Sequence, residues 1–130
     1  MNIAAILCEY NPLHAGHRRH IDLTRAQGFD AVVGVMSGNF VQRGDLAIYD
    51  KWRRAKSAVD AGMNLVVEMP TPCVLQSAQG YAECGLTLMA ALGANVVSFG
   101  SECGDAALLD RAAVMLSQRG DEIKAEMEKG

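Results

Sequence analysis

The chain has 130 residues, of which 50% are hydrophobic, 5% are aromatic and 21% are charged, and its formal net charge is −3. This length and composition favour a single small soluble enzyme domain (1–130) with a real core, and the acidic balance excludes a global basic field for nucleic-acid binding. No secretion signal opens the sequence and its apolar runs are too short to cross a bilayer, so we expect a cytoplasmic protein without membrane contact.

Four short apolar runs along the chain predict β-strands. They are continuous rather than alternating, as expected for strands that are covered on both faces. The runs are Ile3 to Cys8, Ala31 to Met36, Leu65 to Glu68 and Val96 to Phe99.

Helix-like segments alternate with these runs. The predicted helices run from about Gly16 to Ala26, from Asp50 to just before Gly62, from near Ser77 to just before Gly93, and from Asp105 onward. Helical spacing predicts inward faces made by Trp52, Ala55 and Val59, by Ala78, Ala82, Leu86 and Met89, and by Leu108, Leu109, Ala112 and Leu116. Trp52 is thus interpreted as a core residue and not as a base-stacking platform. Residues 120–130 are rich in charge and are interpreted as a solvated helix end or tail.

The alternation predicts an α/β fold, a Rossmann-like doubly wound parallel sheet. In such sheets the ligand binds beyond the carboxyl ends of the strands. The segments that follow the four predicted strands are Asn11–His17, Ser37–Asn39, Met69-Pro70 and Gly100–Glu102. We expect all four segments to converge on one rim.

The four cysteines form no metal or redox motif. Cys8, Cys73, Cys84 and Cys103 are scattered, with no C-x-x-C pair and no histidine at zinc-like spacing. We expect them to be buried thiols, as is usual in a reducing cytosol.

The most informative segment follows the first strand and reads Glu9-Tyr10-Asn11-Pro12-Leu13-His14-Ala15-Gly16-His17. It places two histidines where a helix begins, and a helix N-terminus favours negative charge because its amide donors are free. A strand, a turn and a helix start are the context of a phosphate motif. We therefore predict that His14 and His17 bind nucleotide phosphates, whereas His20 alone is interpreted as a residue with an ordinary hydrogen bond.

This segment resembles the first signature of the nucleotidyltransferase superfamily that is named for its His-x-Gly-His motif. The segments Val35-Met36-Ser37-Gly38-Asn39-Phe40-Val41-Gln42-Arg43-Gly44, Asp50-Lys51-Trp52 with Arg54-Ala55, and Phe99-Gly100-Ser101-Glu102 are similar to one branch, the bacterial tRNA(Met) cytidine acetate ligases. The resemblance covers nearly the whole chain up to about Gly104.

The resemblance implies a two-step reaction. ATP and acetate give acetyl-adenylate and pyrophosphate, and the acetyl group then passes to N4 of the wobble cytidine of elongator tRNA(Met). His14 and His17 would be the catalytic residues, as donors to the triphosphate in a reaction that depends on positioning and electrostatic stabilisation. Mg²⁺ would be carried mainly by the phosphates, because few carboxylates reach this rim and no protein metal site is expected.

The resemblance also implies which residues form the ATP site. They are Leu7, Cys8, Glu9, Tyr10, Asn11, Pro12, Leu13, His14, Ala15, Gly16, His17, Arg18, Arg19 and His20, together with Gly100. A glycine at position 100 permits close approach of the backbone to adenosine. For Glu9 and Glu102 we expect hydrogen-bonding or loop-shaping roles rather than metal contacts.

Several basic residues surround the second predicted helix. Arg43 and Lys51 lie near the predicted rim and are candidates for contacts with phosphates of ATP or tRNA. For Arg53 and Lys56 we expect a solvated outer face.

The superfamily's second signature, a Ser-Thr-x-x-Arg segment, does not occur in this sequence, nor does the C-terminal region expected to hold tRNA. We therefore expect the ATP-binding front part of a longer enzyme, without the last strand of the sheet, that binds ATP weakly and does not complete acetyl transfer alone. A bare sheet edge would favour self-association.

Two other functions stay open. One is adenylyl transfer to a cofactor precursor such as nicotinate mononucleotide or phosphopantetheine, which uses the same first motif but which the Ser37–Gly44 segment disfavours. The other is a non-catalytic nucleotide- or RNA-binding module, which the missing second signature favours.

Overall fold

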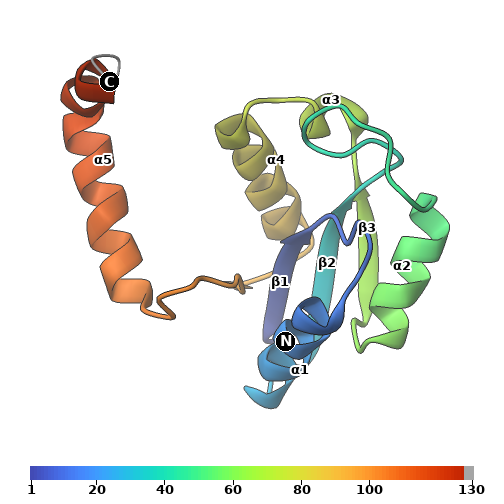
Figure 1. Cartoon of the computed structure of the whole chain (residues 1–130). Coiled ribbons are helices and arrows are strands. Elements are labelled where there is room, and N and C mark those ends of the chain that lie inside the picture. The colour runs from blue at the N-terminus through green and yellow to red at the C-terminus, as the bar shows by residue number, and fades with distance from the viewer. Residues whose placement is uncertain (128–130) are drawn as a thin grey trace. The chain divides into compact units, whose positions relative to one another are not determined.

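The computed structural model describes the backbone of residues 1–127, in two compact units. In chain order the first unit, Met1–Phe99, contains β1 (Ile3–Cys8), α1 (Ala15–Ala26), β2 (Ala31–Ser37), α2 (Lys51–Asp60), β3 (Leu65–Met69), α3 (Thr71–Val74), α4 (Ala78–Ala91) and β4 (Val96–Val97) (Figure 1). The second unit begins at Gly100 and contains α5 (Ala106–Met127), whose backbone is non-helical at Arg119. The last part of the predicted tail, 128–130, lies outside the described residues, and the single-domain boundary stays a prediction.

Four parallel strands form one sheet in the order β3-β2-β1-β4. In the register, Ile3 of β1 lies opposite Ala31 of β2, and Ala4 lies opposite Val96 of β4. Each strand after β1 is reached through a helical crossover, as parallel pairing requires. The predicted α/β parallel sheet is confirmed.

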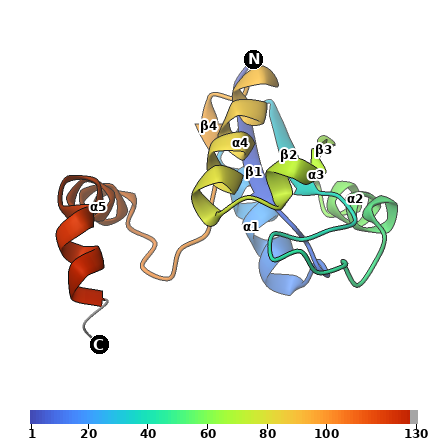
Figure 2. The same ribbon diagram turned by 90° about the horizontal axis from the view of Figure 1, so that it is seen from above.

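Along each strand the side chains point alternately to the two faces of the sheet. Helices cover both faces. On one face, strand residues Ile6, Cys8, Val32 and Met36 pack with Ile21 of α1 and with Ala58 and Ala61 at α2. On the other face, Ala5, Val33, Val35 and Met69 pack with Val74 of α3 and with Tyr81 and Met89 of α4 (Figure 2). Full burial of one such aliphatic side chain contributes about 1.5–3 kcal/mol, so the two clusters stabilise the sheet that carries the rim.

Gly85 allows α4 to lie close to β1. A Cβ atom at this position would lie 2.8 Å from Cδ1 and 2.9 Å from Cδ2 of Leu7, which is closer than van der Waals contact. The helix therefore rests directly on the strand that leads into the predicted site.

The predicted strands match the structure except at the fourth. β1 has the predicted bounds, and β2 and β3 each extend one residue further. β4 ends at Val97 instead of Phe99, because it pairs with β1 over two residues only. The short helix α3 was not predicted, since four residues carry no helical period.

The predicted inward face of α2 is confirmed at Ala55, which packs against the core, but is wrong at Trp52 and Val59. Trp52 is 75% exposed and Val59 is 47% exposed, whereas Arg54 and Ala58 are buried. Helix α2 places Arg54 on its inward face, because backbone carbonyl groups of the neighbouring loops accept hydrogen bonds from its guanidinium there. The interpretation of Trp52 as a core residue is therefore wrong.

Other predicted inward residues are also exposed. In α4, Met89 is buried as predicted, but Leu86 is half exposed and Tyr81 and Gly85 take the inward positions. In α5, Leu108 and Leu116 are exposed. Apolar spacing found these helices but did not select their packed faces.

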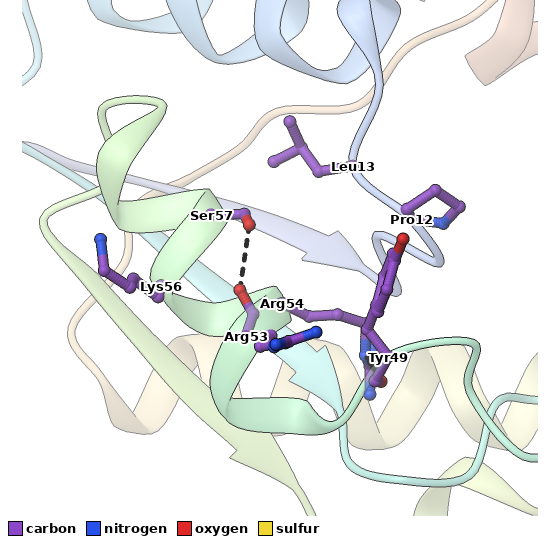
Figure 3. Close-up of a pocket in the computed structure, with 7 residues that line it drawn as sticks. All are labelled: Pro12, Leu13, Tyr49, Arg53, Arg54, Lys56 and Ser57. Atoms are coloured by element: carbon purple, nitrogen blue, oxygen red, sulfur yellow. Dashed lines mark hydrogen bonds between the residues drawn. The ribbon is translucent and has the colours of Figure 1, made fainter.

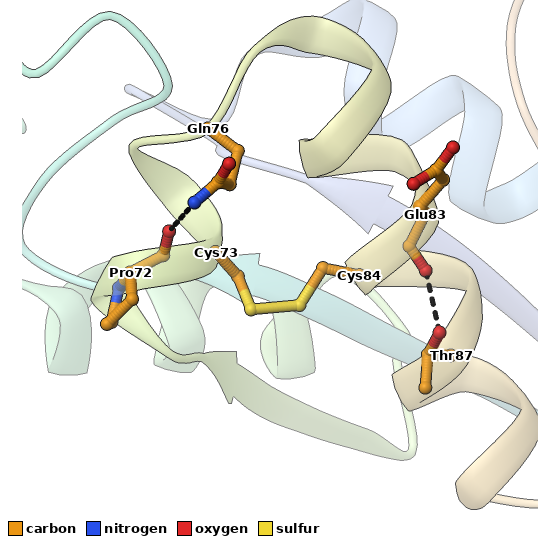
Figure 4. The surroundings of a disulfide bond; sticks show 6 residues. All are labelled: Pro72, Cys73, Gln76, Glu83, Cys84 and Thr87. Carbon is orange, nitrogen blue, oxygen red and sulfur yellow. Dashed lines mark hydrogen bonds between the residues drawn. A yellow bond between two sulfur atoms is a disulfide. The ribbon is translucent and has the colours of Figure 1, made fainter.

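The expectation of four buried thiols is also wrong. Cys73 of α3 and Cys84 of α4 form a disulfide (Figure 4), since the chain folds back after α3 and brings their Cα atoms to 6.0 Å. Cys8 is a buried free thiol as predicted, whereas the free Cys103 is exposed. Within residues 1–127, no helix combines the length and the hydropathy that crossing a membrane requires.

Candidate functional site

The turn between β1 and α1 carries the predicted histidine pair. Tyr10 has the left-handed backbone conformation, with φ at 47°, and turns the chain sharply after β1. The Asn11-Pro12 peptide is cis, and α1 begins at Ala15 with His14 as its N-cap. The N-terminus of α1 therefore lies at the carboxyl end of a central strand, where parallel sheets bind their ligands.

His14 and His17 cap this helix end reciprocally. The Gly16 N–H donates to Nδ1 of His14 at 3.1 Å, and the His14 N–H donates to Nδ1 of His17 at 3.4 Å. The two rings are stacked, with their centroids 3.7 Å apart. Since each Nδ1 accepts a backbone hydrogen bond, the neutral rings carry their protons on Nε2, and both Nε2–H groups are left to donate to a ligand.

The surroundings of His17 and His20 favour the neutral form of their rings. Burial lowers the pKa of His17, and the neighbouring His14 and His20 rings lower it further. Burial also lowers the pKa of His20, whose Nε2 is hydrogen-bonded to Oγ of Ser98 at 2.8 Å. This bond confirms the ordinary hydrogen bond that was predicted for His20.

These lowered pKa values make stability depend on pH. The unfolded chain titrates its histidines near 6.5, so below that pH it binds more protons than the folded chain, and its free energy falls relative to that of the folded chain. We therefore expect the urea midpoint to fall as the pH is lowered from 7 to 5.5, and to fall less in the His17→Gln/His20→Gln variant. Equal slopes in the two proteins would contradict this assignment.

A buried arginine connects three segments around the turn. The Arg54 side chain, 1% exposed, donates to the carbonyls of Glu9, Ser37, Gly38 and Tyr49 and to Oγ of Ser37. These acceptors belong to the turn after β1, the loop after β2 and the residues before α2. Burial lowers the pKa of Arg54, and the Glu9 carboxylate opposes this shift. The guanidinium thus fixes the backbone from which the histidines project.

Two side chains of the turn hold the loop after β2 as well. Oε1 of Glu9 accepts from the Gln42 N–H at 2.7 Å, and Oδ1 of Asn11 accepts from the Ile48 N–H at 2.7 Å. The loop-shaping role predicted for Glu9 is confirmed. The family resemblance had selected both of these segments from the sequence. In the structure the two hydrogen bonds join them.

The two other basic candidates differ in their surroundings. Arg43 lies exposed in the loop after β2. Nζ of Lys51 forms a salt bridge of 2.6 Å with Oε2 of Glu68 and lies 5.3 Å from the centroid of the Trp52 ring. Phosphate contacts of both residues stay predictions.

The rest of the predicted ATP segment divides into buried and exposed members. Leu7 packs against the core on the α4 side, and burial raises the pKa of the Cys8 thiol to about 12, which makes it a poor nucleophile. The Tyr10 ring is buried 4.9 Å from the His17 ring. The exposed members at the turn and start of α1 are Pro12, Ala15, Gly16, Arg18 and Arg19.

Two residues predicted from the sequence are not part of the first unit. Gly100 and Glu102 belong to the second unit, so their roles stay predictions. Among the described residues, no group of three or more histidine, cysteine or acidic side chains is placed to hold a metal ion.

A surface cavity of about 370 Å³ adjoins the turn, and it was not predicted. It is lined by Pro12, Leu13, Tyr49, Arg53, Arg54, Lys56 and Ser57 (Figure 3). No sequence pattern indicated this cavity, because Arg53 and Lys56 in its wall were assigned to a solvated outer face.

Known proteins resemble this chain in sequence. The family model described as HIGH Nucleotidyl Transferase matches residues 1–130. The tRNA(Met) cytidine acetate ligase of Caldicellulosiruptor saccharolyticus is 45% identical over 125 residues, which are 95% of this chain and 31% of that protein. The ligase of the same name from Syntrophotalea carbinolica is 42% identical over 124 residues, again 95% of this chain and 30% of the relative.

Solved structures also resemble this chain. The crystal structure of Thermotoga maritima TmcAL bound with alpha-thio ATP matches with a TM-score of 0.86 and 38% identity, over 100% of this chain and 33% of that one. The apo form of the same protein matches with a TM-score of 0.85. The chain therefore spans about a third of the length of the proteins it matches.

Proposed function

Because this chain belongs to the HIGH Nucleotidyl Transferase family, we propose that it is the ATP-binding part of a tRNA(Met) cytidine acetate ligase. The observation that carries the proposal is the stacked pair of His14 and His17 at the start of α1, with both Nε2–H groups free to donate. The similarity to Thermotoga maritima TmcAL, which binds alpha-thio ATP, supports the same nucleotide here.

The chemistry follows from this arrangement. An acetate oxygen attacks the α-phosphorus of ATP, the bond to the β-phosphate oxygen breaks, and pyrophosphate leaves with the developing negative charge. Nε2–H groups of His14 and His17, together with the amides at the start of α1, donate to the phosphate oxygens as that charge grows. Neutral imidazoles that are fixed by their own Nδ1 hydrogen bonds need no reorganisation during this step.

The second step uses the activated acetate. The N4 amine of the wobble cytidine attacks the acetyl carbonyl, AMP leaves, and the amine loses one proton. Mg²⁺ would be held mainly by the phosphates of ATP, since the described residues place no ligand cluster for it. Acetate, elongator tRNA(Met), a cytoplasmic location and self-association are parts of this proposal that rest on the family resemblance.

A chimera tests the proposal directly. Residues 1–130 replace the matching segment of the Caldicellulosiruptor saccharolyticus relative, and N4-acetylcytidine in tRNA(Met) is measured with ATP and acetate. We expect an active chimera, and saturable ATP binding but no acetyl transfer by the 130-residue chain alone. Pyrophosphate release that responds to nicotinate mononucleotide or phosphopantetheine instead of acetate would support the cofactor-precursor reaction. ATP binding with an inactive chimera would support a non-catalytic module.

A further inference from the structure

The exposed side of α2 and the residues before it carry aromatic rings beside cations. Trp52 is 75% exposed and Tyr49 is 46% exposed, so neither ring serves the core. Nζ of Lys51 lies 5.3 Å from the Trp52 ring centroid, and Cζ of Arg53 lies 6.0 Å from that of Tyr49. We call Tyr49, Trp52, Arg53 and Lys56 the aromatic-basic surface. An exposed tryptophan flanked by cations is typical of a surface that binds π-systems joined to negative charge.

The charge of this region departs from that of the whole chain. Residues 39–60 carry five lysines and arginines and three acidic residues, in a chain whose formal net charge is −3. Of these cations Arg54 is buried and Lys51 pairs with Glu68, so Arg43, Arg53 and Lys56 are the cations left for a ligand. Lys56 pairs with Asp60 at 2.6 Å, but both side chains are well exposed, and exposed pairs are weak enough to be exchanged for a phosphate. In the described part of the chain, Arg53 has no carboxylate within salt-bridge distance. The region therefore favours a polyanion.

The aromatic-basic surface is continuous with the candidate site. Tyr49, Arg53 and Lys56 line the cavity whose opposite wall is Pro12 and Leu13, the residues just before His14 (Figure 3). A cavity volume of about 370 Å³ is large enough to hold one nucleotide-sized group. A chain that crosses α2 would thus pass directly beside the histidine pair.

We propose that the aromatic-basic surface binds an unpaired segment of an RNA chain. The rings of Tyr49 and Trp52 stack on unpaired bases, while Arg53 and Lys56 contact the phosphates between them. Stacking of this kind requires bases that are not paired in a duplex, which excludes an RNA helix as the preferred occupant. The inference rests on the proposed function for the identity of the RNA, but it concerns a different set of side chains.

Trp52 provides the measurement, because it is the single tryptophan of the chain. A short single-stranded oligoribonucleotide is titrated while Trp52 emission is followed, and the same strand is then titrated as a duplex. We expect saturable quenching by the single strand, weaker affinity at higher salt, and at least roughly fivefold weaker binding of the duplex. Quenching by anionic lipid vesicles but not by the single strand would overturn the proposal in favour of a membrane surface.

Variants locate the binding. Tyr49→Ala and Arg53→Gln are each expected to weaken binding roughly fivefold or more, and Tyr49→Phe is expected to retain it, because the ring is kept. Phe99→Ala and Arg111→Gln are matched controls, since both remove an exposed side chain of the same kind elsewhere. Urea midpoints show that each variant is folded. Equal affinity in Tyr49→Ala, Arg53→Gln and the controls would overturn the proposal.

ATP binding in the same variants separates the two proposals. Among the described ring contacts, Tyr49 pairs with Arg53, whereas the His17 ring contacts His14 and Tyr10. Tyr49→Ala is therefore expected to bind ATP as the parent chain does. RNA binding that depends on Tyr49 and Arg53 in a chain that fails to bind ATP would support the surface and contradict the proposed function. ATP binding without any response of Trp52 to RNA would leave the function standing and overturn the surface.

Discussion

The double variant His14→Asn/His17→Gln is expected to lose ATP affinity by roughly tenfold to a hundredfold while it keeps the fold. In the proposed ATP site each Nε2–H would donate a hydrogen bond to an anionic oxygen, and a hydrogen bond to a charged group is worth about 1.5–3 kcal/mol. Two such bonds lost, with partial replacement by water, account for this range. In the active chimera the loss in turnover is expected to be larger, on the order of a hundredfold or more, because the donors act on charge that grows in the transition state.

The choice of substitutions separates phosphate binding from helix capping. Both histidines cap α1 through Nδ1, so alanine at either position removes a cap as well as a donor. Asparagine is a preferred N-cap residue, and glutamine three positions later completes the usual capping box. The variant therefore keeps both caps and removes both imidazole donors.

Calorimetric titration with ATP and Mg²⁺ checks the affinity, and urea unfolding checks the fold. The control is Asp22→Asn, which changes an exposed side chain of α1 outside the predicted ATP segment and is expected to change ATP affinity little. An unchanged affinity in His14→Asn/His17→Gln would show that the pair only caps α1. The site would then have to be sought among the amides of the turn alone.

The part of the site at the turn between β1 and α1 could be predicted from sequence, because the residues that form it are neighbours in the chain. The apolar run of β1, the turn residues and the histidines at the start of α1 lie within residues 3–17, and each signal is read from neighbours in the chain. Their mutual geometry was not predictable, since the reciprocal use of Nδ1 depends on the turn at Tyr10 and on the first turn of α1 together.

The part of the site on α2 was predicted wrongly, because the residues that determine it lie far from α2 in the sequence. Periodicity assigned Trp52 to the core, as an apolar residue at helical spacing, and gave Arg54 no role. The acceptors that make burial of Arg54 favourable come from Glu9, Ser37 and Gly38, far along the chain, and no local pattern displays them. The Cys73–Cys84 disulfide was missed for the same reason, because only the packing of α3 on α4 brings the sulfurs together.

Replacement of Arg54 by methionine is expected to lower the free energy of unfolding by at least about 3 kcal/mol. Methionine keeps much of the volume but leaves the carbonyls of Glu9, Ser37, Gly38 and Tyr49 without their donor in a buried position. A buried acceptor without a partner costs about 1–3 kcal/mol, and several are created at once. Because small domains are stable by only about 5–15 kcal/mol, the loss should be plain in urea unfolding.

The neighbouring arginine supplies the control. Arg53 is exposed on the same helix, so Arg53→Met is expected to change stability by less than about 0.5 kcal/mol. Arg54→Lys is expected to be intermediate, since an ammonium keeps the charge but does not reproduce the planar fan of donors. The histidines project from a turn that Arg54 holds through the Glu9 carbonyl, so ATP affinity should fall with the loss of this tie even where Arg54→Lys remains folded. Stability and ATP affinity equal to those of the parent chain in Arg54→Met would show that the turn is held by the Glu9 and Asn11 side chains alone.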